Sequence, residues 1–191
     1  MTIIETYLSK CKEIIERIDK QQPEIAQAAS WFAESILAGR VVHVFGSGHS
    51  RIMVEEMWPR YGSFPGFNPI VELSLTYHNN VVGANGQRQA MFLENVSGLA
   101  ERILRNFATT PQDTALVISS GGCNIVPVEM AEQFQQRHLA TRFLAVVLHP
   151  FHVSLHRPEG VAALDFRIRF LEVDQVTAAD VAVKSPNQKL P

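Results

Sequence analysis

Two short loops rich in glycine and serine carry the residue types that bind anions. The first follows the apolar run 41–45 and comprises Gly46, Ser47, Gly48, His49 and Ser50. The second follows the apolar run 115–118 and comprises Ser119, Ser120, Gly121, Gly122, Cys123 and Asn124. Each loop precedes a segment with helical spacing. A helix N-terminus there would offer free N–H groups and a positive dipole end, to which serine hydroxyls add donors. Two such loops predict a ligand that carries phosphate.

Glu56 is a candidate base for removing a proton beside a carbonyl group, which is work for a carboxylate or a histidine with a pKa near neutrality. It lies in a helix predicted over 49–58. Helical angles place Glu56 beside the buried side of that helix and Glu55 away from it. The apolar residues that define this side are Met53, Val54, Met57 and Trp58. The alternative is a structural role for Glu56, paired with Arg51 or Arg60.

Glu94 and His78 are two further candidates for proton transfer. Glu94 lies opposite the apolar stripe of a helix predicted from Phe92 to Phe107, so it would face water or a partner subunit. His78 lies in a polar segment and would suit the proton shuttling of sugar-ring opening, or would simply be solvated. Cys123 follows two glycines at a helix start, but no base is placed beside it. A small packing residue is therefore the simpler interpretation.

Composition excludes several classes of function. The 191 residues carry a net charge of −2, which provides no basic field for nucleic acid. No apolar run reaches the roughly 18 residues that span a bilayer, and the N-terminus has no secretory signal. Cys11 and Cys123 predict free thiols in a reducing cytoplasm. Cysteine and histidine spacing predicts no zinc site, and we expect neither a metal nor an organic cofactor.

Three apolar runs without alternation, 41–45, 115–118 and 143–148, are typical of strands buried on both faces. Helical segments between them predict a single α/β domain with a doubly wound, mostly parallel sheet. A second strand is expected at 70–73 and a half-exposed strand at 165–173, and the segment 79–87 is polar and contains glycine. Ligands bind at the carboxyl ends of strands in such sheets, and both loops fall at those ends.

A helical hairpin over residues 1–38 is expected ahead of the sheet core at 41–150. Its first helix has more apolar positions on one stripe than a surface helix needs, which predicts a homodimer. These positions are Ile3, Ile4, Tyr7, Leu8, Cys11, Ile14, Ile15 and Ile18.

A dinucleotide fingerprint is the first alternative for the loop at 46–50. Gly46 and Gly48 match its first two glycines, and Glu72 could be the ribose-binding acid. Arg51 occupies the third glycine position, where a side chain prevents close packing of helix on strand.

The motifs resemble those of the sugar isomerase (SIS) domain family. The resemblance rests on residues 41–50, the pair Glu55 and Glu56, and residues 118–124 with Pro127 and Glu129. It extends over residues 1 to about 150. It is closest to an uncharacterised bacterial SIS subfamily with a G-[ST]-G-H-S loop and a Glu-Glu pair. His78 and the segment 94–101 also match that subfamily, and Glu56 matches an active-site glutamate of N-acetylmuramic acid 6-phosphate etherases.

This resemblance implies a three-layer α/β/α, flavodoxin-like fold with a five-stranded sheet, and a dimer with its sites near the subunit interface. It implies a phosphosugar isomerase or an etherase-like lyase that acts on a phosphosugar or related carbohydrate derivative. The alternative is a non-catalytic sensor of such ligands. By resemblance, Ser47, His49 and Ser50 would line the pocket, and Ser119, Ser120 and Asn124 would hold the phosphate.

The sequence departs from the family pattern in two places. Gly121 stands where the family loop has a second serine, which removes one hydroxyl donor. The residues usual for the family's further strand and closing helix are not found in 153–191, so the tail at 151–191 is interpreted as divergent, truncated or altered.

Overall fold

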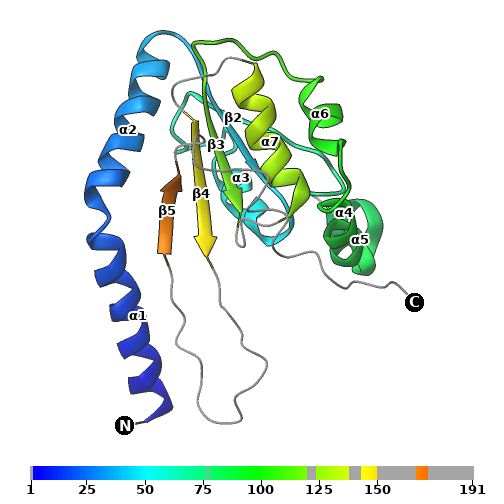
Figure 1. The fold of residues 1–191 in the computed structure, drawn as a ribbon. Coiled ribbons are helices and arrows are strands. Elements are labelled where there is room, and N and C mark those ends of the chain that lie inside the picture. The colour runs from blue at the N-terminus through cyan, green and yellow to red at the C-terminus, as the bar shows by residue number, and fades with distance from the viewer. Residues whose placement is uncertain (1, 77, 120–123, 138–142, 150–166, 172–191) are drawn as a thin grey trace.

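A computed structural model describes residues 2–76, 78–119, 124–137, 143–149 and 167–171. Its sheet has five strands in the order β2-β1-β3-β4-β5. The strands are β1 (Val42–Gly46), β2 (Phe67–Pro69), β3 (Thr114–Ser119), β4 (Phe143–His149) and β5 (Arg167–Leu171). The first four pair in parallel, and β5 is antiparallel to β4. The mostly parallel sheet expected from the unalternating apolar runs is confirmed (Figure 1).

The second strand lies earlier in the chain than the sequence indicated. It is β2, and the expectation of a strand at 70–73 was wrong. Gly66 adopts a φ of +101° and turns the chain, so pairing with β1 begins at the next residue. Ile70 still donates its N–H to the Val44 carbonyl, after which the chain leaves the sheet. Pro69 is tolerated because β2 is an edge strand.

Two apolar cores lie on opposite faces of the sheet. Val42 and Val44 of β1 belong to one core, and Phe45 belongs to the other, as alternation along a strand requires. The first core is closed by α2 (Gln22–Leu37) and α3 (Arg51–Glu56), which contribute Ala28 and Val54. The second is closed by α6 (Leu99–Leu104) and α7 (Ile125–Gln136), which contribute residues such as Leu104 and Phe134. The three-layer architecture is therefore confirmed.

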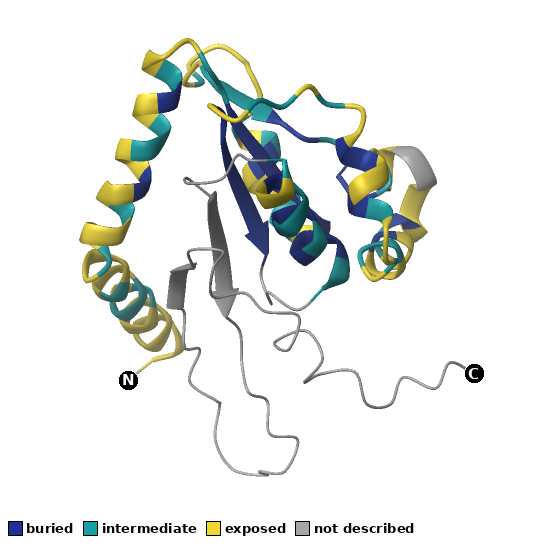
Figure 2. Ribbon diagram, turned by 45° about the horizontal axis from the view of Figure 1, so that its top comes forward, coloured by how far each residue is buried: buried dark blue, intermediate teal, exposed yellow. Residues whose placement is uncertain are grey.

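The N-terminal helices form an extended arm. Thr2 and Glu5 make a capping box that starts α1 (Ile3–Asp19), and Pro23 lies in the first turn of α2. The two helices follow each other along one side of the sheet instead of folding back on one another as a hairpin (Figure 1). None of residues 3–19, all of which the structure describes, is buried (Figure 2).

The long helix expected through Phe92 and Phe107 is interrupted. The chain forms α4 (His78–Val82), a short 3-10 turn η2 (Gly83–Asn85) and α5 (Gly86–Leu93), then a turn at 94–98, and only then α6. The polar, glycine-containing segment 79–87 is therefore helical. Gly98 adopts a φ of +80°, which a continuous right-handed helix cannot contain. Phe92, expected on the buried stripe, is 64% exposed.

Candidate active site

The two loops begin side by side at the carboxyl edge of the sheet. β1 and β3 are adjacent and parallel, with Gly46 in register with Ile118. The expected placement of both loops at neighbouring strand ends is thus confirmed. Ser119 ends β3 and is buried, and Asn124 is the N-cap residue of α7 with extended backbone. Ser120, Gly121, Gly122 and Cys123 lie outside the described residues.

The first loop is held tightly from within. A Cβ atom at position 46 would lie 2.7 Å from the Ser50 carbonyl oxygen, so only glycine fits there. Gly48 adopts a φ of +54° and donates its N–H to the Leu75 carbonyl at 3.2 Å. That N–H therefore serves the fold and not an anion. His49 is exposed and Ser50 is half-buried, so these two side chains border the open side of the loop.

Arg51 folds back over the same loop. Its guanidinium donates to the Gly48 carbonyl at 3.0 Å and to a carboxylate oxygen of Glu55 at 3.0 Å. This pairing secures the 3-10 turn η1 (Gly48–Ser50) to α3. The position that a dinucleotide fingerprint reserves for glycine is thus filled by a side chain that braces the loop.

The orientations expected for the two glutamates of α3 are reversed. The Glu56 side chain is 71% exposed and pairs with Arg60, whereas the Glu55 side chain is 29% exposed. Met53 and Trp58, expected on the buried side, are 47% and 41% exposed. The reason is that α3 is only six residues long and follows a 3-10 turn, so helical angles extrapolated over 49–58 do not apply.

Glu94 joins the first loop to the start of α7. Its carboxylate oxygen Oε2 accepts a hydrogen bond from the buried Ser47 hydroxyl at 2.9 Å. The same oxygen would be 3.3 Å from a Cβ atom at Gly48. Its main-chain carbonyl accepts from the Val126 N–H, in the first turn of α7, at 2.9 Å. Glu94 was expected to face water or a partner; the residue is half-buried, and its carboxylate also contacts the first loop.

His78 is fully buried at the start of α4. Its Nδ1 lies 3.0 Å from the Asn79 side-chain oxygen, and its Nε2 has no hydrogen-bond partner among the described residues. A Cβ atom at Gly86 would lie 2.3 Å from the His78 carbonyl oxygen, so α5 packs directly on this residue. The alternative of a solvated loop histidine does not hold.

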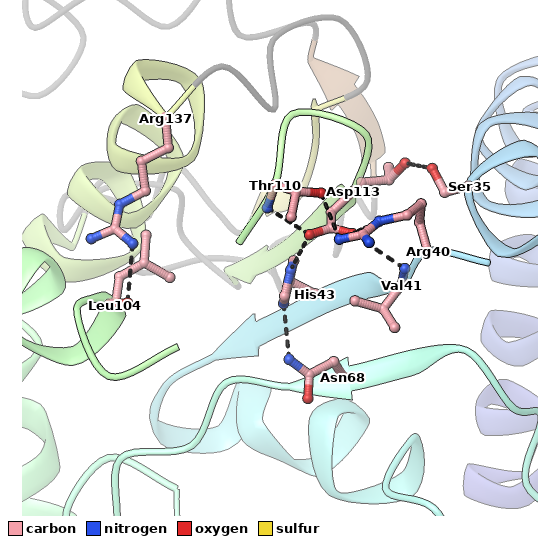
Figure 3. A network of polar contacts seen from close by, with 10 residues as sticks. Ser35, Arg40, Val41, His43, Asn68, Leu104, Thr110, Asp113 and Arg137 are labelled. Carbon is pink, nitrogen blue, oxygen red and sulfur yellow. Dashed lines mark hydrogen bonds and ion pairs between the residues drawn. The ribbon is translucent and has the colours of Figure 1, made fainter. Parts of the chain in front are cut away.

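A second polar cluster lies at the opposite, amino edge of the sheet, and sequence reasoning missed it. His43 of β1 lies 3.2 Å from a carboxylate oxygen of Asp113 through Nε2 and 2.9 Å from the Asn68 amide nitrogen through Nδ1 (Figure 3). Asp113 also accepts hydrogen bonds from Arg40 and from main-chain N–H groups. The sequence signal that could have revealed this cluster is His43, a polar residue inside an apolar strand.

The protonation states of this cluster follow from its burial. Burial lowers the pKa of His43, and Asp113 offsets this only in part. The Asn68 amide donates to Nδ1, so the ring is neutral and donates from Nε2 to Asp113. Burial alone would raise the pKa of Asp113, but hydrogen bonds from Thr110, Arg40, His43 and Val41 outweigh it and lower the pKa. The cluster joins β1 to β3 at the amino ends of these strands, whereas the loops follow their carboxyl ends.

Within the described ranges, no three histidine, cysteine or carboxylate side chains are grouped to hold a metal ion. The same ranges include no helix with the length and apolarity to cross a membrane.

Comparison with known proteins identifies the family of this chain. A family profile described as "SIS domain" matches residues 6–142. A UPF0309 protein of Halalkalibacterium halodurans is 30% identical over 128 residues, which cover 67% of this chain and 50% of that protein. A UPF0309 protein of Geobacillus kaustophilus is 26% identical over 191 residues, covering 99% and 73%.

The chain therefore spans about half the length of the first of these relatives. Among solved structures, a phosphoheptose isomerase from Francisella tularensis is similar with a TM-score of 0.49 and 17% identity, covering 80% of this chain and 78% of that one. Because the family profile covers well over half of the residues, this chain belongs to the SIS domain family.

Proposed function

We propose that this protein binds a phosphorylated sugar at the carboxyl ends of β1 and β3 and acts on it as an isomerase or an etherase-like lyase. The observation that carries the proposal is the position of Glu94. Its side chain contacts the first loop at Ser47, and its main chain contacts the start of the helix that follows the second loop. Membership of the SIS domain family supports the same ligand class.

A carboxylate in this position does not serve phosphate affinity. Two unit negative charges about 8 Å apart at an effective dielectric constant of about 20 repel each other by about 2 kcal/mol. A carboxylate does not increase the affinity of a site that only holds an anion. A site that removes a proton from the carbon beside a carbonyl group uses a carboxylate as its base.

In the proposed reaction the phosphate lies at the second loop, and Glu94 faces the reacting end of the sugar. Glu94 takes a proton from the carbon next to the carbonyl. An isomerase returns that proton to the former carbonyl carbon, while the hydroxyl proton on the first carbon moves to the former carbonyl oxygen. A lyase instead lets the ether group on the next carbon leave with the bond electrons as an alkoxide, which takes the proton held by Glu94. Ser47 orients the carboxylate through its hydrogen bond. His78 is proposed to assist ring opening through its unpartnered Nε2.

Glu56 remains the second candidate for the base. Its exposure and its pairing with Arg60 give it the environment of a surface carboxylate. It would act only if another chain or a ligand covered α3. We therefore propose Glu94 as the base, and we use a variant of Glu56 as the control for a variant of Glu94.

A thermal-shift panel tests ligand class directly. We expect a phosphosugar to raise the melting temperature more than inorganic phosphate or the unphosphorylated sugar does. At a ligand concentration of about 100 times Kd the gain is about 2.7 kcal/mol, or roughly 5–10 °C for a chain of this size. The panel includes fructose 6-phosphate, glucosamine 6-phosphate, sedoheptulose 7-phosphate and N-acetylmuramic acid 6-phosphate. If none exceeds inorganic phosphate, the proposal fails.

We also propose that the protein is a cytoplasmic homodimer joined through α1. Cys11 is a free thiol, as expected in a reducing compartment. Ile4, Leu8 and Ile15 of α1 are 71%, 52% and 64% exposed, an apolar stripe that a lone chain would leave in water. Sedimentation of the wild type should give twice the 21.3 kDa chain mass. The double variant Ile4→Glu with Leu8→Glu should sediment as a monomer, whereas the control Lys12→Ala should stay a dimer. Wild-type particles of 21.3 kDa alone would contradict the dimer.

A further inference from the structure

We infer that Glu129 is a positioning residue for the reaction. It fixes the turn at 94–98 to α7, and so keeps Glu94 in place beside the first loop. This inference rests on the proposed function, because it assigns Glu129 a role in the placement of the proposed base.

The Glu129 carboxylate accepts three hydrogen bonds from the turn. The Ser97 hydroxyl donates to it at 2.6 Å, and the Gly98 N–H donates to its two oxygens at 3.1 and 2.8 Å. Hydrogen bonds to an ionised acceptor are about twice as strong as neutral ones. Gly98 is held here in its left-handed conformation, which is the bend that separates α5 from α6.

A second attachment lies one turn earlier on α7. The Val126 N–H donates to the Glu94 carbonyl at 2.9 Å. Positions 126 and 129 are three residues apart and share one face of the helix. Both ends of the turn are therefore bound to α7. Glu94, the first residue of the turn, is bound by Val126, and Ser97 and Gly98, the last two residues, are bound by Glu129.

A third contact extends this attachment to the far end of α6. The guanidinium of Arg137, just after α7, donates to the carbonyl of Leu104, the last residue of α6, at 3.2 Å (Figure 3). The turn and both ends of α6 are thus attached to α7. Loss of the Glu129 contacts would free the turn that carries Glu94 to Ser47.

A purely structural role would have a different signature from a positioning role. Loss of a structural contact lowers the folded fraction, or the melting temperature, and leaves kcat per folded molecule unchanged. Loss of a positioning contact lowers kcat with little change in KM, because a displacement of about 1 Å costs up to about 100-fold in rate. The effect should also vanish when the base itself is absent, because coupled residues are not additive.

The first test measures exchange of solvent deuterium into the phosphosugars of the panel by proton NMR, which follows proton removal for an isomerase or a lyase alike. We expect kcat for exchange to fall about 100-fold in Glu129→Ala and about 10-fold in Glu129→Gln, with KM within about twofold. Glu132→Gln, on the same helix, should match the wild type. In a Glu94→Gln background, Glu129→Ala should add nothing. Equal kcat in Glu129→Ala and Glu132→Gln, or a full additional loss in the double variant, overturns the inference.

Amide hydrogen exchange tests the inference without any substrate. Glu129→Ala should speed exchange by about 10-fold or more both in peptides covering 94–98 and in those covering 46–50, because Glu94 links the two. The strand peptide 114–119 should be unchanged. Faster exchange at 94–98 alone refutes the coupling. Absence of deuterium incorporation by the wild type would instead contradict the proposed function, and the hydrogen-exchange result would still decide the role of Glu129.

Discussion

Glu94→Gln is expected to slow turnover of the phosphosugar substrate by about 10²- to 10⁴-fold, the usual range for loss of a general base. The same variant should bind phosphosugars at least as tightly as the wild type. Glutamine keeps the size and can still accept the hydrogen bond from Ser47, while the charge that repels the phosphate is gone. Calorimetric Kd values and deuterium exchange into the sugar measure the two effects separately.

Glu56→Gln is the matched control for this result. Its side chain is exposed and paired with Arg60, which lies just beyond the end of α3, so we expect turnover within about twofold of the wild type. The opposite outcome, loss of turnover only at Glu56, would move the base to α3 and require that something covers that helix. Tight binding of a phosphosugar without turnover by the wild type would instead favour the non-catalytic sensor.

Asp113→Ala is expected to lower the free energy of unfolding at neutral pH by about 3–5 kcal/mol, the range for removal of one partner from a buried charged network. The carboxylate is buried and accepts hydrogen bonds from His43, Arg40 and two main-chain N–H groups, all of which lose their acceptor. The melting temperature should fall by roughly 6–20 °C. Asp19→Ala, at an exposed helix end, should change stability by no more than about 0.5 kcal/mol. Equal stability of the two variants in urea would show that the network is dispensable.

The same cluster predicts how stability depends on pH. Burial lowers the pKa of folded His43, so below 6.5 the unfolded chain binds a proton that the folded chain does not. Stability is therefore lost as pH falls from about 7 toward the lowered pKa. Asp113 has a lowered pKa, so its contribution is present above 3.8 and is lost as pH falls through the folded value. His43→Gln should flatten the profile between pH 5 and 7, and an unchanged slope would contradict this assignment.

The parallel sheet and the position of the two loops could be predicted from the sequence. Apolar runs such as 41–45 and 115–118 show no alternation, and buried parallel strands are the local structure that such runs favour. Glycine and serine directly after each run indicate a tight loop, and parallel strands place such loops at one edge. These features are local, or follow from topology alone, so residue order was enough to find them.

The choice among the candidate side chains depended on tertiary contacts. Helical spacing identified an apolar stripe through Phe92 but not the turn at 94–98, because that turn is held by Glu129, which lies more than thirty residues further along the chain. The contact between Ser47 and Glu94 joins residues 47 positions apart, and the one between His43 and Asp113 spans 70. Periodicity describes one element at a time and contains no information on such pairs. The sequence alone thus determined which edge of the sheet carries the two loops, where we propose that an anion binds. Only the folded chain decided which carboxylate contacts the first loop.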